Sequence, residues 1–247
     1  MTSKNEWKHA SFKEKWDFFW KYNKVHVIIW AIGLIVLGIF LYQKITTPVL
    51  IFHGMALNTS TKEESATKEL TDELLQINNV DPTSGQVIFL NSYSYYPNDS
   101  EKSEENFNCS EYILIQKEKT SLDFIIGPLS VVQDIAYNDL FQDLEGFLTD
   151  EEIALCEDYF LYVDTNVITK IANAYEEDKD ISSIKIPDAS NPEEMKKPVA
   201  TMIDVSKSEK LSKLYVPEEQ DEPIVIAIMT DAPDKILTLK FIQYLMK

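Results

Sequence analysis

The chain contains 247 residues, of which 41 are acidic and 23 are basic, so its formal net charge is −18. This balance argues against a nucleic-acid-binding protein, because such proteins neutralise phosphates with a basic surface. All 23 basic residues are Lys. Without Arg the chain lacks the planar bidentate donor that clamps phosphate, which argues against an Arg-finger phosphoryl transferase.

Positive and negative charges are separated along the chain. Residues 1–44 hold 7 Lys and 3 acids, a net charge of +4. Residues 45–247 hold 16 Lys and 38 acids, a net charge of −22. The sequence therefore consists of two regions of opposite charge that meet near residue 44.

The first predicted element is a helix over residues 12–23 with two different faces. One face carries the aromatic residues Phe12, Trp16, Phe19 and Trp20, and the other carries Lys13, Asp17, Lys21 and Lys24. Such a helix suits the headgroup layer of a membrane, where aromatic rings set the depth and lysines meet anionic lipid. The alternative is a docking face for a protein partner.

Residues 25–42 are predicted to span a lipid bilayer. They read VHVIIWAIGLIVLGIFLY, without Asp, Glu, Lys or Arg. At about 1.5 Å per residue, a helix of this length crosses the hydrocarbon core. A buried helix of a soluble protein would keep a polar stripe. A cleaved signal peptide is also disfavoured, because neither a small-x-small cleavage pattern nor a lipid-attachment Cys follows Tyr42.

The distribution of Lys predicts the orientation of this signal anchor. Six Lys precede the span, whereas only Lys44 and Lys62 lie within the twenty residues after it. Because Lys near a span is retained in the cytoplasm, residues 1–24 are expected inside the cell, and residues 49–247 outside it after a linker over residues 43–48. The residues expected to anchor the chain are Trp16, Phe19, Trp20, Lys21, Lys24, Trp30, Tyr42 and Lys44.

Strands and helices alternate after the span. Predicted strands are residues 49–57, 86–96, 122–126, 160–164, 199–205 and 223–229. Predicted helices are residues 61–77, a stretch around 107–115, and residues 129–137, 149–158 and 234–246. Residues 78–85 and 97–105 are predicted turns or loops, and residues 176–197 a charged loop. This alternation predicts an α/β domain with a parallel or mixed sheet.

Two of the predicted helices carry a capping box, a Ser or Thr followed three residues later by Glu. They are Thr61 with Glu64 and Thr149 with Glu152. The apolar side of the first helix is formed by Leu70, Leu74, Leu75 and Ile77, and that of the last by Ile236, Leu239, Phe241, Ile242 and Leu245. These periodic positions are expected to face the core.

Three segments resemble a known family. They are LDFIIGP at residues 122–128, YNDLFQDLEGFLTDEEIALCEDYFLYVD at residues 137–164, and EPIVIAIMTDAPDKILTLKFIQYLM at residues 222–246. They are similar to segments of extracellular solute-binding proteins of the type II periplasmic-binding fold from Gram-positive bacteria. The resemblance implies a two-lobed α/β ectodomain with a cleft. The chain is shorter than most such proteins, and a span replaces their common lipid-modified Cys.

Few residues suited to catalysis occur after the span. Of the three His, only His53 follows it, inside a predicted buried strand, where it is expected to be a core residue. Six scattered Gly form neither a dinucleotide fingerprint nor a phosphate loop. Cys109 and Cys156 are compatible with one disulfide or two free thiols. We therefore expect no catalytic residue, no metal site and no cofactor, and rank an enzyme last.

Ligands of α/β sheets bind at the carboxyl ends of strands. The candidate ligand-binding residues at such ends are Asn58, Ser60, Asn91, Tyr93, Tyr95, Tyr96, Gly127, Ser130, Asp164, Asn166 and Asp231. Aromatic faces beside Asn and Ser suit a sugar or a peptide. The alternative for the three tyrosines is that they pack one face of a strand under a loop, because alternate residues of a strand face opposite sides.

Two functions follow from these observations. The first is a membrane-anchored, non-catalytic extracellular domain that binds a small solute or peptide. The second is a structural component of a cell-envelope complex whose ectodomain binds a protein partner. A polar cavity with aromatic walls would favour the first function, and a broad apolar patch without a cavity would favour the second.

Overall fold

The chain divides into two compact units in the computed structural model, Met1–Pro48 and Val49–Lys247. The structure describes residues 11–46, 49–59, 64–77, 80, 85–97, 99–181, 183–218, 222–233 and 235–246. The predicted capping residue Thr61, the candidate Ser60 and most of the predicted turn at residues 78–85 lie outside the described residues. Each unit is considered by itself below.

The described part of the first unit forms one helix, α2 (Phe12–Thr46), which is 35 residues long. Its segment Phe19–Tyr42 is long and apolar enough to cross a membrane, and none of its most apolar window is buried. An apolar helix that exposes its side chains needs an apolar environment, so α2 is compatible with a single-pass anchor. A signal sequence has the same length and composition, and α2 alone leaves the orientation open.

Aromatic side chains gather at the start of α2, as predicted. The ring of Trp16 lies 6.4 Å from those of Phe12 and Trp20 and 6.0 Å from that of Phe19, measured between centroids. Further along, Lys21, Lys24, Trp30 and Tyr42 are exposed, whereas the side chain of Lys44 lies outside the described residues. The helix therefore presents the predicted aromatic face.

The second unit is built on one six-stranded sheet. Its strands are β1 (Val49–Leu57), β2 (Gly85–Tyr93), β3 (Phe124–Pro128), β4 (Phe160–Asp164), β5 (Pro198–Asp204) and β6 (Ile224–Ile228), arranged in the order β2-β1-β3-β6-β5-β4. Strands β1, β2 and β3 are parallel, while β6 is antiparallel to both of its neighbours and β4 is antiparallel to β5. The predicted α/β class with a mixed sheet is confirmed, and the described strands form one sheet rather than two lobes.

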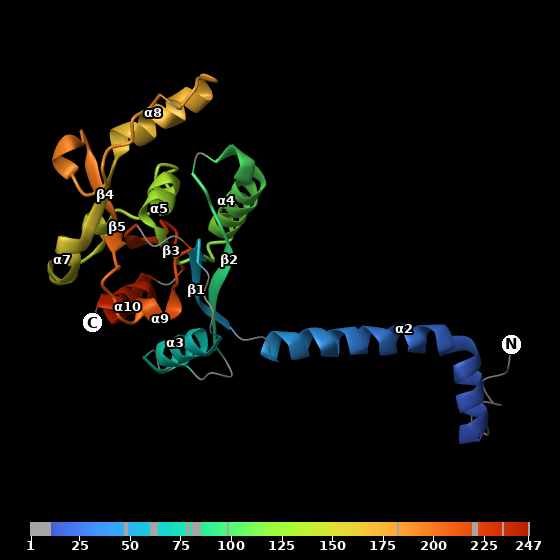
Figure 1. Cartoon of the computed structure of the whole chain (residues 1–247). Coiled ribbons are helices and arrows are strands. Elements are labelled where there is room, and N and C mark those ends of the chain that lie inside the picture. The colour runs from blue at the N-terminus through green and yellow to red at the C-terminus, as the bar shows by residue number, and fades with distance from the viewer. Residues whose placement is uncertain are drawn as a thin grey trace. The chain divides into compact units, whose positions relative to one another are not determined.

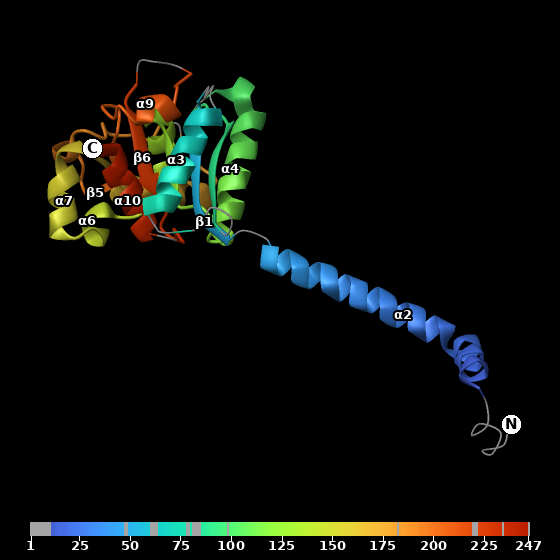
Figure 2. The same ribbon diagram turned by 90° about the horizontal axis from the view of Figure 1, so that it is seen from below.

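Helices cover both faces of this sheet. They are α3 (Glu64–Ile77), α4 (Ser103–Glu118), α5 (Leu129–Ala136), α6 (Leu144–Phe147), α7 (Asp150–Cys156), α8 (Thr165–Glu176), α9 (Leu211–Leu214) and α10 (Lys235–Met246). Helices α4, α5 and α8 lie on one side of the sheet, above it in Figure 1. Helices α3 and α10 lie on the other side, in front of the sheet in Figure 2.

Aromatic side chains fill the core between β1, β3 and α10. The ring centroids of Phe52, Phe124 and Phe241 lie 5.0 to 5.5 Å from one another, and all three side chains are fully buried. Gly54 allows this packing, because a Cβ atom there would lie 2.1 Å from the Phe124 ring. The close approach of that ring therefore requires Gly at position 54.

Several predicted elements match the structure closely. The strands predicted at residues 49–57 and 160–164 have the bounds of β1 and β4. The capping box of Thr149 and Glu152 is present at the start of α7, with both of its hydrogen bonds formed. Leu74 and Leu75 of α3 are buried as predicted, whereas the side chains of Leu70 and Ile77 lie outside the description.

Several predictions differ from the structure, including the strand predicted at residues 86–96, which ends at Tyr93. The loop predicted at residues 97–105 contains a 3₁₀ turn, Ser100–Lys102, and α4 already begins at Ser103. Helix α8 has no predicted counterpart. Ile236 of α10 is 70% exposed, because the buried residues Leu237, Phe241 and Leu245 define a stripe on the opposite side of the helix.

His53 is a satisfied core residue, as predicted. Only 3% of the residue is exposed, and its Nδ1 lies 2.8 Å from the Ser121 carbonyl oxygen. Its Nε2 lies 3.2 Å from the Tyr112 hydroxyl. A carbonyl only accepts, so Nδ1 carries the proton and Nε2 accepts from Tyr112. The neutral ring thus has a partner for each nitrogen.

The stability of residues 49–247 should fall as the pH is lowered from about 7.5 to about 5.5. Burial lowers the pKa of His53 from its ordinary value of 6.5, outweighing the Ser121 hydrogen bond. The unfolded chain therefore binds the proton first, and stability is lost below the unfolded pKa, by at most about 1.4 kcal/mol per pH unit. His53 is the only His in this unit, so His53→Gln should flatten the pH profile of chemical unfolding, and an unchanged profile would refute this assignment.

Candidate functional site

The direction of the strands decides which predicted site residues come together. The carboxyl ends of β1, β2 and β3 meet at one edge of the sheet, close to Asn58, Tyr95, Tyr96 and Ser130. Strands β4 and β6 run the other way, so Asp164, Asn166 and Asp231 lie at the opposite edge. The candidate ligand-binding residues therefore form two groups at opposite edges of the sheet. The sequence did not predict this division, because the alternation of strands and helices does not reveal the direction of each strand.

Asn58 holds the backbone of Tyr95. Its Nδ2 donates to the Tyr95 carbonyl oxygen at 2.9 Å, and its Oδ1 accepts from the Tyr95 N–H at 2.8 Å. The backbone of Asn58 has a φ of 53°, in the left-handed region that Asn tolerates better than most residues. Both ends of its amide are used, so Asn58 positions Tyr95.

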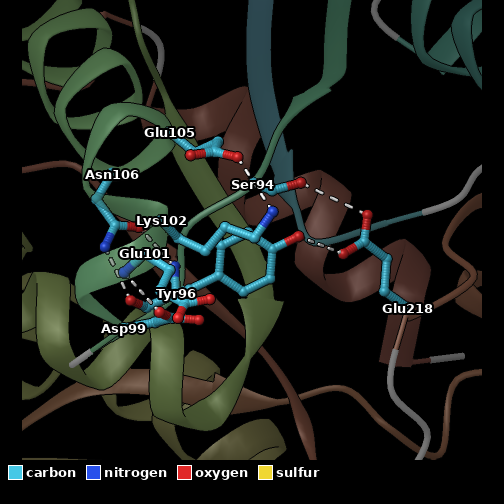
Figure 3. Close-up of polar contacts among 8 residues, drawn as sticks. All are labelled: Ser94, Tyr96, Asp99, Glu101, Lys102, Glu105, Asn106 and Glu218. Atoms are coloured by element: carbon cyan, nitrogen blue, oxygen red, sulfur yellow. Dashed lines mark hydrogen bonds and ion pairs between the residues drawn. The ribbon is translucent and has the colours of Figure 1, made fainter.

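Tyr96, the next residue, is held by a second Asn in the same way (Figure 3). The Tyr96 N–H donates to Asn106 Oδ1 at 2.7 Å, and Asn106 Nδ2 donates to the Tyr96 carbonyl oxygen at 2.8 Å. The Tyr96 hydroxyl donates to Glu218 at 3.0 Å, and Lys102 lies 5.4 Å from the centre of its ring. Residues 95 and 96 are thus clamped between the end of β1 and the start of α4.

A segment at residues 215–218 closes the end of β1. The Tyr215 hydroxyl donates to the Leu57 carbonyl oxygen, and Thr59 Oγ1 donates to the Val216 carbonyl oxygen at 3.0 Å. The Glu218 N–H donates to the Asn58 carbonyl oxygen at 3.0 Å. The polar groups at this strand end are therefore satisfied by the protein itself.

A small cavity of about 240 Å³ remains at this edge. It is lined by Asn58, Tyr95, Tyr96, Pro97, Asp99, Pro128, Ser130, Val131, Glu218 and Glu222. Its carboxylates already accept hydrogen bonds from the Glu101 N–H, the Tyr96 hydroxyl and the Ser130 N–H. Ligand pockets are usually larger than about 300 Å³, so we regard this cavity as part of the support for Tyr95.

A larger cavity of about 560 Å³ lies among α4, α5, α8 and the side chains of Ile181, Ile184 and Ile186. It is lined by Tyr95, Ser110, Asp134, Tyr137, Asn138, Ile171, Tyr175, Ile181, Ile184 and Ile186. We call it the tyrosine cavity after its three tyrosines. Its volume lies in the range of small-molecule sites, and its exposed lining is mainly polar, with four Ile side chains and the tyrosine rings beside the polar groups.

Tyr95 and Asp134 form the polar centre of the tyrosine cavity. The Tyr95 hydroxyl donates to Asp134 Oδ2 at 2.6 Å. Burial raises the pKa of Tyr95 far above its ordinary value of 10.0, and Asp134 raises it further. Tyr95 is therefore a neutral hydrogen-bond donor that fixes the orientation of the Asp134 carboxylate.

Sequence reasoning found only Tyr95 among the residues that line the tyrosine cavity. Asp134 and Tyr137 lie on and just after α5, and Tyr175 lies on α8, which no prediction covered. A signal for α8 does exist, because Ile168, Ile171 and Tyr175 follow Asp164 at helical spacing. That three helices would surround one cavity is a tertiary property.

Four further candidate ligand-binding residues line neither of these two cavities. Tyr93 stacks on Tyr112 of α4 with ring centroids 4.6 Å apart, in keeping with the packing alternative. Gly127 is buried, and a Cβ atom there would lie 3.3 Å from Leu57. Asn91 and Asp231 are exposed.

Asp164 holds the start of α8. Its carboxylate accepts from the backbone N–H groups of Asn166, Lys196 and Lys197 at 2.9 to 3.1 Å. Burial alone would raise the pKa of Asp164, but these three donors outweigh it and lower the pKa below 3.8. The Asn166 amide nitrogen is buried without a hydrogen-bond partner among the described residues. Asp164 is therefore the N-cap of α8.

Both cysteines are buried free thiols. Burial raises the pKa of Cys109 to about 12 and that of Cys156 to about 11, so neither is a ready nucleophile. Within the described ranges, no three His, Cys, Asp or Glu side chains are grouped as a metal site would require.

No protein-family model, no curated protein and no solved structure matches the chain. The fold is an α/β domain with a mixed six-stranded sheet, preceded by an apolar helix long enough to cross a membrane. Its function is therefore argued from the geometry of the tyrosine cavity.

Proposed function

We propose that residues 49–247 form a non-catalytic, extracellular binding domain that takes a small solute or a peptide side chain into the tyrosine cavity. The observation that carries this proposal is the cavity of about 560 Å³ with three tyrosines and Asp134 in its walls. Rings with a polar tip contact a ligand over a large area and also donate hydrogen bonds. Tyr side chains have only two χ angles, so they lose little conformational entropy when they contact a ligand, and they therefore suit ligand recognition.

The cavity lies between α4, which follows β2, and α8, which follows β4 at the other end of the sheet. In the two-lobed arrangement of the solute-binding proteins that three segments between residues 122 and 246 resemble, a ligand cleft lies between the lobes. The tyrosine cavity is the counterpart we propose for that cleft.

We place this domain outside the cell, anchored by α2 in the cell membrane. Six Lys precede the apolar segment and two follow it within twenty residues, which favours a cytoplasmic N-terminus. Protease added to intact cells should then digest residues 49–247 and leave α2 behind. Digestion of residues 49–247 only after the cells are lysed would show that these residues lie inside the cell and would contradict the proposed orientation.

Tyr175→Ala should weaken ligand binding at least about tenfold without unfolding the domain. Tyr175 lines the cavity and is 63% exposed, so its removal costs little packing. Phe107→Ala is the matched control, because Phe107 lies on α4, is 66% exposed and does not line the cavity. The measurement is a thermal-shift screen of sugars, peptides and amines on the full chain in detergent.

A ligand present at a hundred times its Kd stabilises the folded protein by roughly 2.7 kcal/mol, which a thermal-shift screen detects. A compound that stabilises the wild type and Phe107→Ala but not Tyr175→Ala would support the proposal. Absence of a shift with every class of compound would contradict it, as would equal shifts in all three proteins.

The second candidate function is assembly with a cell-envelope protein. An apolar cavity of about 230 Å³ between α7 and α10 favours it, with Leu155, 65% exposed, at its wall. If this cavity is the interface, Leu155→Ser should abolish cross-linking to a membrane partner, whereas Tyr175→Ala should not.

A further inference from the structure

The walls of the tyrosine cavity carry a negative charge. Among the described residues, Asp134 is the only formally charged one that lines it, and no described Lys does. One Asp134 oxygen accepts from the Tyr95 hydroxyl, while no described residue donates to the other. An anionic ligand would meet a carboxylate with no cation to offset it, so the cavity disfavours anions.

The rings of the cavity favour a cation. Tyr95, Tyr137 and Tyr175 come from three different elements and line the same space. The face of an aromatic ring is negative and attracts ammonium groups, and several rings around one cavity form the arrangement that recognises them. Tyr95 stays a neutral phenol, because burial and Asp134 raise its pKa.

The rim of the cavity is acidic. Tyr175 and Ile181 line the cavity, and the chain between them contains Glu176, Glu177, Asp178, Lys179 and Asp180. Four acids and one Lys make this exposed segment strongly negative, and Lys179 already pairs with Glu177. A negative rim raises the local concentration of cations.

We infer that the tyrosine cavity binds an organic cation, an amine or a quaternary ammonium compound. This inference rests on the proposed function and specifies its ligand class. The cation lies against the tyrosine faces and beside the carboxylate of Asp134. A neutral sugar could donate a hydrogen bond to the carboxylate but would gain no attraction between opposite charges.

The test compares probes that differ only in charge. Choline is paired with its uncharged isostere 3,3-dimethylbutan-1-ol, and glucamine is paired with sorbitol. Each is titrated by calorimetry into the full chain in a non-ionic detergent at neutral pH. We expect each cation to bind at least about tenfold more tightly than its neutral partner. Raising the salt from about 20 mM to about 200 mM should weaken only the cations.

Asp134→Asn is the informative variant, because the Asn oxygen can still accept from Tyr95 while the charge is removed. It should reduce the preference for cations to about twofold or less. Asp139→Asn removes the same charge from an exposed residue outside the cavity. The φ of Asp139 is 56°, which Asn also adopts readily, so this control should fold and keep the preference.

The outcomes separate the two proposals. Equal binding of charged and neutral partners would overturn the cation inference and leave the proposed binding function standing. If Asp134→Asn and Asp139→Asn lose the preference for cations equally, the preference comes from the overall charge of the domain. That result would overturn the assignment of the cation site to the tyrosine cavity. If none of the four probes binds, the cation inference falls, and the thermal-shift screen decides the proposed function.

Discussion

Asp164→Ala is expected to destabilise the domain of residues 49–247 by about 3–5 kcal/mol, the largest effect of any polar substitution considered for this chain. Asp164 is 4% exposed, and its carboxylate accepts from three backbone N–H groups, which Ala would leave without a partner. Two of those groups belong to Lys196 and Lys197, so the substitution also frees the segment that leads into β5. The measurement is urea unfolding followed by circular dichroism.

The stability of Asp164→Ala should also decrease less than that of the wild type when the pH is lowered into the acidic range. The pKa of Asp164 in the folded state lies below its ordinary value of 3.8, so its contribution is complete above that value and is lost as the pH falls through the lowered pKa. Asp188→Ala is the control, because exposed Asp188 also accepts from a backbone N–H and has a lowered pKa. A stability of Asp164→Ala equal to that of Asp188→Ala would contradict this assignment.

Loss of Asp164 should also affect binding. Helix α8 begins at Thr165 and carries Ile171 and Tyr175, which form one wall of the tyrosine cavity. Without its N-cap the first turn of α8 frays, so ligand-induced stabilisation should decrease even under conditions where the variant is folded.

Asn58→Ala is expected to destabilise the domain by about 3 kcal/mol. The substitution removes both hydrogen bonds to the Tyr95 backbone and places Ala at a φ of 53°. Asn58→Gly removes the same hydrogen bonds without backbone strain, so it should be more stable than Asn58→Ala by about 1 kcal/mol. Chemical unfolding of the three proteins measures both contributions.

The Asn58 variants also test whether Tyr95 is positioned from its backbone. If it is, Asn58→Gly should weaken ligand binding in the tyrosine cavity although Asn58 does not line that cavity. Asn106→Ala, which removes the equivalent pair of hydrogen bonds from Tyr96, should affect binding less, because Tyr96 does not line the cavity either. Equal effects of the two substitutions on binding would contradict a specific role for Asn58.

Local patterns in the sequence were sufficient for the elements whose signals lie within a few residues. Residues 49–57 and 160–164 are rich in β-branched and aromatic residues and form β1 and β4 with those bounds. Thr149 and Glu152 form a capping box because the two hydrogen bonds are local. The isolation of His53 in a buried strand was also enough to predict a core residue.

Other features depend on contacts between distant residues. The sequence places Asp164 after a strand, as it does Asn58, but only the antiparallel pairing of β4 with β5 puts Asp164 at the opposite edge of the sheet. Asn91 and Tyr93 lie on the same strand, yet only the packing of α4 against β2 buries part of Tyr93.

The sequence by itself determined the charge separation, the apolar helix, the α/β class and most of the strands, because composition and periodicity act over short distances along the chain. Only the tertiary structure decided the site. The tyrosine cavity takes Tyr95, Asp134 and Tyr175 from segments up to 80 residues apart. Their meeting follows from strand order and helix packing, which short-range patterns do not encode.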